Sequence, residues 1–237
     1  MRFISLFAGV GGFDLGLERA GHSCIGQVEI DPQCVKILEA HWPHVPKHDD
    51  VTTAKEWANA NGFIGSTDLV CGGFPCQDVS VAGKRAGLAG KRSGLFFDAL
   101  EFAVHVQAKI ILLENVPGLL SSNGGRDFGT VLSEMANAGY RHIEWRVLDS
   151  QYFGVPQRRR RVFIVGSTTD RSSSPIFIER EGLRGDITAS KSARETATEA
   201  TGGSLARMRG FGDYKLDATA STLKSRDYKD VTDIVVR

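Results

Sequence analysis

The chain has few of the residues that would indicate a metal centre, a disulfide scaffold or a membrane protein. Its 237 residues include four cysteines, at positions 24, 34, 71 and 76, with no C-x-x-C pair and no histidine beside them at ligand spacing. We therefore expect no metal site, and such sparse cysteines favour a reducing compartment, the cytoplasm. No apolar run approaches a membrane span, and glycines follow the N-terminus too soon for a signal peptide, so no membrane partner is expected.

The chain also lacks an excess of charge of either sign. Lysine and arginine total 29 against 28 acidic residues, and hydrophobic residues make up 41%, which is ordinary for a globular protein. A site for a polyanion must therefore come from local clusters of basic residues. Two regions qualify: Lys84-Arg85 with Lys91-Arg92, and the run Arg158 to Arg161.

A cysteine turn in the first half of the chain is the strongest candidate for chemistry. The apolar run at residues 68–71 predicts a buried parallel strand, and Cys76 lies in the turn just beyond it. Open α/β sheets bind ligands at this end of their strands. The glycine-rich and basic segment from Ser80 to Gly94 predicts a loop over the turn, which favours a nucleophile facing an anionic substrate. Taken alone, the motif favours a buried core cysteine, because free cysteines are among the most buried residues, and it is the rest of the chain that reverses this preference.

A glycine turn near the N-terminus predicts a second binding element. Residues 3–7 are expected to form a strand, which Ala8-Gly9-Val10-Gly11-Gly12 connects to a helix that stops at Gly21. Glycines let backbone N–H groups approach a ligand, and a helix N-terminus favours a negative group. The spacing is G-x-G-G rather than G-x-G-x-x-G, so a pyrophosphate is not specifically indicated.

Three acidic residues are expected at the carboxyl ends of strands. Glu29 ends the predicted strand 24–30, about 20 residues beyond the glycine turn, where such folds bind ribose hydroxyls. Asp50 follows a short strand near Val45 and could meet an adenine amino group, and Glu114 follows the buried strand 110–113. The simpler alternative is that Glu29 and Asp50 belong to helix caps and that Glu114 is a structural acid.

Seven β-type segments alternating with helices predict a doubly wound α/β domain over residues 1–166, with a mostly parallel, Rossmann-like sheet. The helices are expected near residues 32–41, 95–107 and 128–138. Residues 167–237 have a different composition, dominated by small and polar residues between 186 and 204, with short candidate strands at 219–223 and 233–236.

These motifs resemble, in order and spacing, those of the DNA cytosine-5 methyltransferases. The matching segments are Phe7-Ala8-Gly9-Val10-Gly11-Gly12, Pro75-Cys76-Gln77, Leu95-Phe96-Phe97-Asp98, Glu114-Asn115-Val116 and Gln157-Arg158-Arg159-Arg160-Arg161. The resemblance implies the fold of S-adenosylmethionine-dependent methyltransferases, with S-adenosyl-L-methionine as methyl donor. It implies that the donor is bound by Phe7, Ala8, Gly9, Gly11, Gly12, Glu29, Ile30, Asp50, Val51, Pro75 and Leu95. Ser5 stands where many members have aspartate.

The resemblance further implies that the reaction is methylation of carbon-5 of a flipped cytosine in duplex DNA. Cys76 would add to carbon-6, Glu114 would hold a proton at ring nitrogen-3, and Arg161 with Arg159 would bind the base oxygen and the adjacent phosphate. Gln77, Ser80, Lys84 and Arg85 would contact the DNA backbone.

Family members continue into two further motifs that this chain lacks before Arg237, and residues 167–237 resemble only the early part of a target-recognition region. The open alternatives are a split enzyme completed by a second polypeptide, a truncated product and a compact variant. The enzyme would work in a restriction–modification or phage setting, in a bacterial or phage-infected cell. Two other functions stay open: a catalytically silent subunit that binds DNA or the cofactor, and an RNA cytosine-5 methyltransferase.

Overall fold

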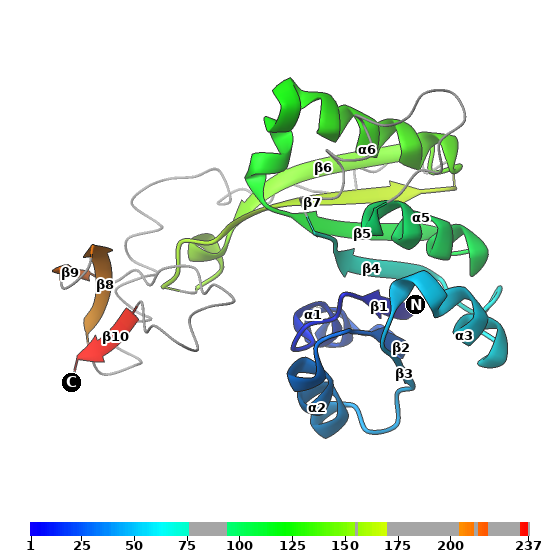
Figure 1. The fold of residues 1–237 in the computed structure, drawn as a ribbon, viewed down its shortest axis with the longest axis horizontal. Helices are drawn as coiled ribbons and strands as arrows, with labels where there is room; N and C mark the ends of the chain where they lie inside the picture. Colours follow the sequence, from blue (N-terminus) through cyan, green and yellow to red (C-terminus); the bar gives the residue numbers. More distant parts are fainter. Residues whose placement is uncertain (76–93, 155, 170–203, 211–212, 218–232, 237) are drawn as a thin grey trace. The chain divides into compact units, whose positions relative to one another are not determined.

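A computed structural model of the chain describes residues 1–75, 94–154 and 156–169, and the backbone of three later strands at 204–210, 213–217 and 233–236 (Figure 1). The chain divides into two compact units, Met1–Arg146 with Val162–Ile176, and Val147–Arg161 with Phe177–Arg237. Among the described residues, no helix combines the length and apolar character needed to cross a membrane.

A seven-stranded sheet in the order β3-β2-β1-β4-β5-β7-β6 forms the centre of the fold. Its strands are β1 (Arg2–Leu6), β2 (Ser23–Val28), β3 (Lys47–His48), β4 (Leu69–Gly73), β5 (Ile110–Asn115), β6 (His142–Asp149) and β7 (Arg160–Ser167). Parallel pairing joins β3, β2, β1, β4 and β5, whereas β7 runs antiparallel to β5. The predicted doubly wound, mostly parallel sheet is therefore confirmed.

Helices connect the strands and cover the sheet (Figure 1). They are α1 (Gly12–Arg19), α2 (Pro32–His41), α3 (Ala54–Ala60), α5 (Leu95–His105) and α6 (Arg126–Asn137), with short 3₁₀ segments η1 (Val51–Thr53), η2 (Pro117–Leu120), η3 (Ser122–Gly125) and η4 (Ser150–Phe153). Figure 1 shows α1 and α2 next to β1, β2 and β3, and α5 and α6 next to β4 through β7.

Side chains pack against both faces of the sheet. Phe13 and Leu17 of α1 pack against a buried cluster of Phe3, Leu69 and Cys71. The opposite side of β5 and β7 meets α6, because a Cβ on Gly166 would touch Met135, Tyr140 and Ile111. A close fit of this kind leaves no room for a side chain at position 166.

Several predicted boundaries shift by a few residues. The strand expected near Val45 is the two-residue β3, Lys47–His48, which pairs with Gln27 and Val28. Helix α5 ends at His105 rather than Gln107, because Gln107 has φ 59°. Helix α6 begins at Arg126, two residues before the apolar pattern, directly after the left-handed Gly125.

A separate three-stranded antiparallel sheet lies in the second unit, in the order β10-β8-β9. Its strands are β8 (Ser204–Gly210), β9 (Asp213–Asp217) and β10 (Asp233–Val236). The strand predicted at 233–236 is thus confirmed as β10, and the strand predicted at 219–223 lies outside the described residues.

Candidate functional site

The turn between β1 and α1 leaves its backbone open on one side. Phe7, Gly9 and Gly11 all have positive φ, at 51°, 56° and 86°, and for a residue with a side chain such as Phe7 this conformation is strained. A Cβ added to Gly9 or Gly12 would meet no heavy atom within 4 Å, whereas one on Gly11 would lie 2.4 Å from the Trp42 ring. The turn therefore packs on Trp42 with one side and presents bare backbone with the other.

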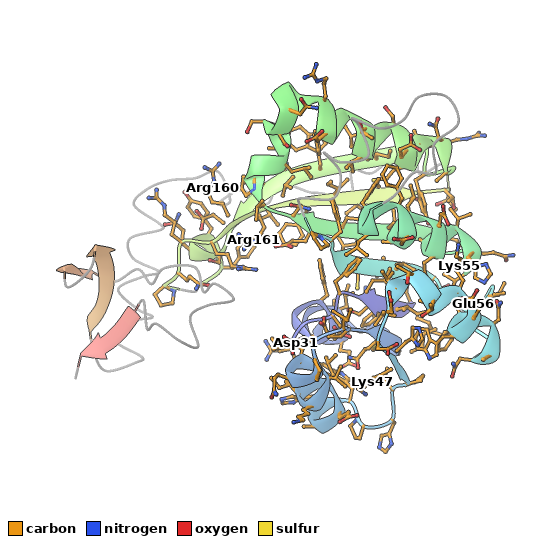
Figure 2. The ribbon with its side chains drawn as sticks, viewed as in Figure 1. Asp31, Lys47, Lys55, Glu56, Arg160 and Arg161 are labelled. Carbon is orange, nitrogen blue, oxygen red and sulfur yellow. The ribbon has the colours of Figure 1, made fainter. Side chains whose placement is uncertain are left out.

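Glu29, which directly follows β2, connects this turn to α2. Its Oε2 accepts the N–H of Gly9 at 2.6 Å, and its Oε1 accepts the N–H of Asp31 at 2.8 Å. Asp31 in turn caps α2 by accepting the N–H of Gln33 at 2.8 Å (Asp31 is labelled in Figure 2). The half-buried Glu29 carboxylate therefore contacts both the glycine turn and the residue that caps α2, and its contact with ribose hydroxyls stays a prediction.

Asp50 caps η1 at the end of the neighbouring strand. Its Oδ1 accepts the N–H of Thr52 at 2.9 Å, and this hydrogen bond holds the pKa of Asp50 below its ordinary value. The next residue, Val51, is buried. The capping role expected as the simpler alternative is therefore present, and it leaves Asp50 ionised at neutral pH.

A pocket of about 320 Å³ lies beside Glu29. Its lining comes from the end of β2, from α2 and from the segment around β3: Glu29, Val35, Glu39, Lys47, His48 and Asp49 (Lys47 is labelled in Figure 2). The ring of His48 stacks on Trp57 at 5.4 Å between centroids, which fixes that wall. The pocket can therefore accept a polar ligand next to the Glu29 carboxylate.

The carboxyl ends of β4 and β5 bring Glu114 against a glycine. Gly73 and Glu114 are paired across the parallel strands. A Cβ on Gly73 would stand 2.9 Å from Glu114 Oε2, and one on Gly72 would stand 2.6 Å from the Leu6 carbonyl oxygen. The two glycines ahead of the cysteine turn thus let a carboxylate and a neighbouring strand approach the backbone.

Asn115 holds the start of the cysteine turn. Its Nδ2 donates to the carbonyl oxygen of Phe74 at 2.8 Å, and its Oδ1 accepts the N–H of Val116 at 2.8 Å. The side chain is buried, and Phe74 also packs on Phe96 of α5 with ring centroids 5.2 Å apart. Phe74 is therefore fixed from two sides, two residues before Cys76.

The arginine run belongs to the second unit. Arg158 and Arg160 are exposed, whereas Arg159 and Arg161 are half-buried, as alternation along a strand predicts. The N–H of Arg159 donates to Ser150 Oγ at 3.2 Å, and Arg161 Nη1 donates to the Arg160 carbonyl at 2.8 Å (Arg160 and Arg161 are labelled in Figure 2).

The remaining predicted residues differ in exposure. Ala8 is buried, Ile30 is 73% exposed, Pro75 is exposed, and Leu95 is the half-buried first residue of α5. The predicted nucleophile and DNA contacts lie outside the described residues: Cys76, Gln77, Ser80, Lys84 and Arg85. Among the described residues, no group of three or more histidine, cysteine or acidic side chains is arranged to hold a metal ion.

Asn115 and Asp14, for which the sequence predicted no role, also lie near the carboxyl ends of the parallel strands. Asn115 stands inside a matching motif, but nothing in the pattern shows that its amide would reach Phe74. Asp14 is fully buried although it lies in the first turn of α1, where an acid is ordinarily exposed.

Comparison with known proteins gives consistent matches. The family model for C-5 cytosine-specific DNA methylases matches residues 1–225. The Type II methyltransferase M2.BsuMI of Bacillus subtilis (strain 168) is 38% identical over 181 residues, which cover 75% of this chain and 44% of that protein. M.HpaII of Haemophilus parainfluenzae is 41% identical over 166 residues, covering 69% of this chain and 45% of that protein.

Among solved structures, S. pombe Dnmt2 methyltransferase matches with a TM-score of 0.56 at 23% identity, over 74% of this chain and 52% of that one. At this identity the likeness shows the fold. The chain spans less than half the length of the two curated relatives.

Proposed function

The chain belongs to the C-5 cytosine-specific DNA methylase family, and from that premise we propose that it transfers a methyl group from S-adenosyl-L-methionine to carbon-5 of cytosine in duplex DNA. The observation that carries the proposal is the juxtaposition of Glu114 with Gly73, on the strand that leads to Cys76. This chemistry needs an acid and a thiol: Glu114 lies near the end of β5, and Cys76 follows β4 in the sequence.

The residues at the glycine turn fit the methyl donor. Gly9 and Gly12 have open space where a side chain would be, so the backbone there can approach a ligand closely. Glu29 is a half-buried acceptor beside this open side, suited to ribose hydroxyls. Asp50 with Val51 would meet the adenine, and Ile30, Pro75 and Leu95 would complete the pocket. When bound, the donor supplies the methyl group as a sulfonium electrophile.

Cys76 makes carbon-5 reactive in this proposal. Its thiolate adds to carbon-6 of the cytosine, and the ring electrons move to carbon-5, which then accepts the methyl group. Loss of the carbon-5 proton and release of the sulfur from carbon-6 regenerate the aromatic ring and the free thiolate. Glu114 neutralises the ring by sharing a proton with nitrogen-3 during the addition. Asn115 positions the cysteine turn through its hydrogen bond to Phe74.

Basic residues would hold the DNA. A paired cytosine cannot reach such a pocket, so the base must leave the stack at a cost of a few kcal/mol. Contacts from Gln77, Ser80, Lys84 and Arg85 to the backbone would offset this cost, and Arg161 with Arg159 would bind the base oxygen and its phosphate. The setting would be restriction–modification in a bacterial or phage-infected cell, and the two relatives named above are Type II methyltransferases of bacteria.

A further polypeptide segment is proposed to cover part of the sheet. On the face that carries α1, Ile110, Leu112 and Phe163 stay half-exposed, whereas Ile111 and Leu113 on the opposite side are buried. Phe163 touches Phe13 only edge-on, with ring centroids 6.2 Å apart. Because the chain spans less than half of its curated relatives, a second polypeptide or a further segment can supply this cover.

Transfer of labelled methyl groups tests the proposal. The chain, alone and together with the C-terminal half of M.HpaII, is expected to label duplex DNA and not tRNA. Cys76→Ala abolishes the transfer, and Cys34→Ala is the matched control, because burial and the nearby Glu29 raise the pKa of the Cys34 thiol and keep it protonated. Labelling of tRNA would favour an RNA cytosine-5 methyltransferase. DNA binding without methyl transfer, both by the chain alone and by the chain with the C-terminal half of M.HpaII, would favour a silent subunit.

A further inference from the structure

The carboxylate of Asp14 joins three elements of the fold. Its Oδ2 accepts a hydrogen bond from Ser5 Oγ of β1 at 3.0 Å. Its Oδ1 accepts one from Gln27 Nε2 of β2 at 2.8 Å and one from the Cys24 thiol of the same strand at 3.3 Å. Asp14 itself lies in the first turn of α1 and is 0% exposed.

Burial of this acid is supported by its surroundings. A buried carboxylate is costly unless donors surround it, and here donors come from two strands while the helix N-terminus favours a negative charge. Burial, followed by the Asp14 charge, raises the pKa of the Cys24 thiol, which therefore stays a neutral donor. Gln27 directs its amide N–H to Asp14 although its own Oε1 is buried without a partner in the described structure.

Ser5 and Asp14 stand on either side of the glycine turn. Ser5 lies near the end of β1, Asp14 lies near the start of α1, and their hydrogen bond closes the segment that contains the positive-φ residues Phe7, Gly9 and Gly11. On its other flank the turn is held by Glu29 through the Gly9 N–H. A strained turn keeps its shape only if its surroundings fix it, and these two contacts do so.

We infer that Asp14, together with Ser5, is a positioning residue for the methyl donor. The pair fixes the ends of the turn so that the open backbone at Gly9 and Gly12 keeps the shape that binds the ligand, and neither side chain touches that ligand. This inference rests on the proposed function, in which the same turn binds S-adenosyl-L-methionine.

Binding of S-adenosyl-L-homocysteine, measured by calorimetry on the full chain below the melting temperature of each variant, tests the inference. Ser5→Ala removes the donor, and Asp14→Asn removes one acceptor oxygen and the charge. Each substitution is expected to weaken binding of S-adenosyl-L-homocysteine about tenfold, because a glycine turn that is displaced from its binding shape loses much of its interaction with the ligand. The double variant is expected to lose little more than the worse single variant, as coupled partners do.

The chain offers a matched control in α6. Asp127 is also a buried acid in the first turn of a helix, and it accepts a hydrogen bond from Ser122 Oγ at 2.5 Å. Ser122→Ala and Asp127→Asn should lower the melting temperature by similar amounts and leave S-adenosyl-L-homocysteine affinity within about twofold of the unmodified chain. This comparison separates positioning from general stability.

Amide hydrogen exchange gives a second readout that does not need the ligand. Ser5→Ala should speed exchange of the Gly9 and Gly11 amides while the amides of β5 keep their protection. If Ser5→Ala binds the probe within about twofold of the unmodified chain, or leaves these two amides unchanged, the positioning role is wrong. If the unmodified chain binds no probe while the amides respond, the proposed cofactor is wrong and the coupling of Ser5 to the turn stands.

Discussion

Gly73 and the Glu114 carboxylate are in close contact, since a Cβ on Gly73 would stand 2.9 Å from the Glu114 Oε2 and would push that oxygen aside. The two residues are paired across β4 and β5. Glycine at position 73, three residues before the proposed nucleophile, therefore leaves the space that the Glu114 carboxylate occupies.

Gly73→Ala should lower kcat of methyl transfer by about a hundredfold, because the added methyl displaces the Glu114 carboxylate from the cysteine turn. Affinity for S-adenosyl-L-homocysteine should stay near that of the unmodified chain. Gly129→Ala in α6 is the control, since a Cβ there meets open space and should stabilise the helix by about 1 kcal/mol. Equal activity of both variants would rule out a role for the Gly73–Glu114 contact.

Asn115→Ala should lower both stability and kcat. The buried Phe74 carbonyl loses its donor, which costs about 1–3 kcal/mol in the free energy of unfolding, and the cysteine turn loosens. Asn61→Ala removes the same kind of bond, from Nδ2 to the Trp57 carbonyl at 2.9 Å, at an exposed site. Denaturant titration and single-turnover kinetics should show that only the Asn115 variant loses activity.

Glu29→Gln should weaken S-adenosyl-L-homocysteine binding by about tenfold or more. The new amide N–H faces one of two backbone donors, Gly9 or Asp31, so a charge-assisted hydrogen bond is lost. Glu56→Gln on α3 removes an exposed acid and should leave calorimetric affinity unchanged (Glu56 is labelled in Figure 2). An unchanged affinity in Glu29→Gln contradicts the proposed ribose contact.

Asp50→Ala should cost stability in a pH-dependent way. The folded pKa of Asp50 is lowered by the Thr52 hydrogen bond, so its stabilising contribution is present above the unfolded pKa of about 3.9 and is lost as pH falls through the folded pKa. The difference in unfolding free energy between the unmodified chain and Asp50→Ala should therefore shrink between pH 5 and pH 2.5. A constant difference over that range would show that the carboxylate charge does not contribute.

Local signals in the sequence predicted the first and last residues of some elements correctly. Helix α2 runs from Pro32 to His41 as expected, because Asp31 caps it and Pro32 suits the first helical position. The position of β3 depends instead on pairing with Gln27 and Val28, and so a local pattern misses it by two residues. The antiparallel direction of β7 likewise follows from pairing with β5, which no local pattern specifies.

The candidate site was predictable where strand ends alone define it. Glu29 directly follows β2, and Glu114 is the second-last residue of β5, which extends to Asn115 rather than ending at residue 113 as predicted. Parallel strands place their carboxyl ends on one edge of the sheet. Asn115 and Asp14 could not be assigned roles in this way. Their hydrogen bonds run to Phe74 and to Ser5, Gln27 and Cys24, and only the assembled strands bring these partners together.

A covalent bond between Cys76 and cytosine is the central claim, and trapping with 5-fluorocytosine DNA measures it most directly. Fluorine cannot leave carbon-5 as a proton does, so the sulfur stays bound after methyl transfer. With S-adenosyl-L-methionine present, we expect a denaturation-resistant complex of protein and duplex DNA whose mass includes one methyl group, formed by Cys34→Ala and absent in Cys76→Ala. Methylation of ordinary cytosine with no trapped complex, or a complex that persists in Cys76→Ala, would contradict the account.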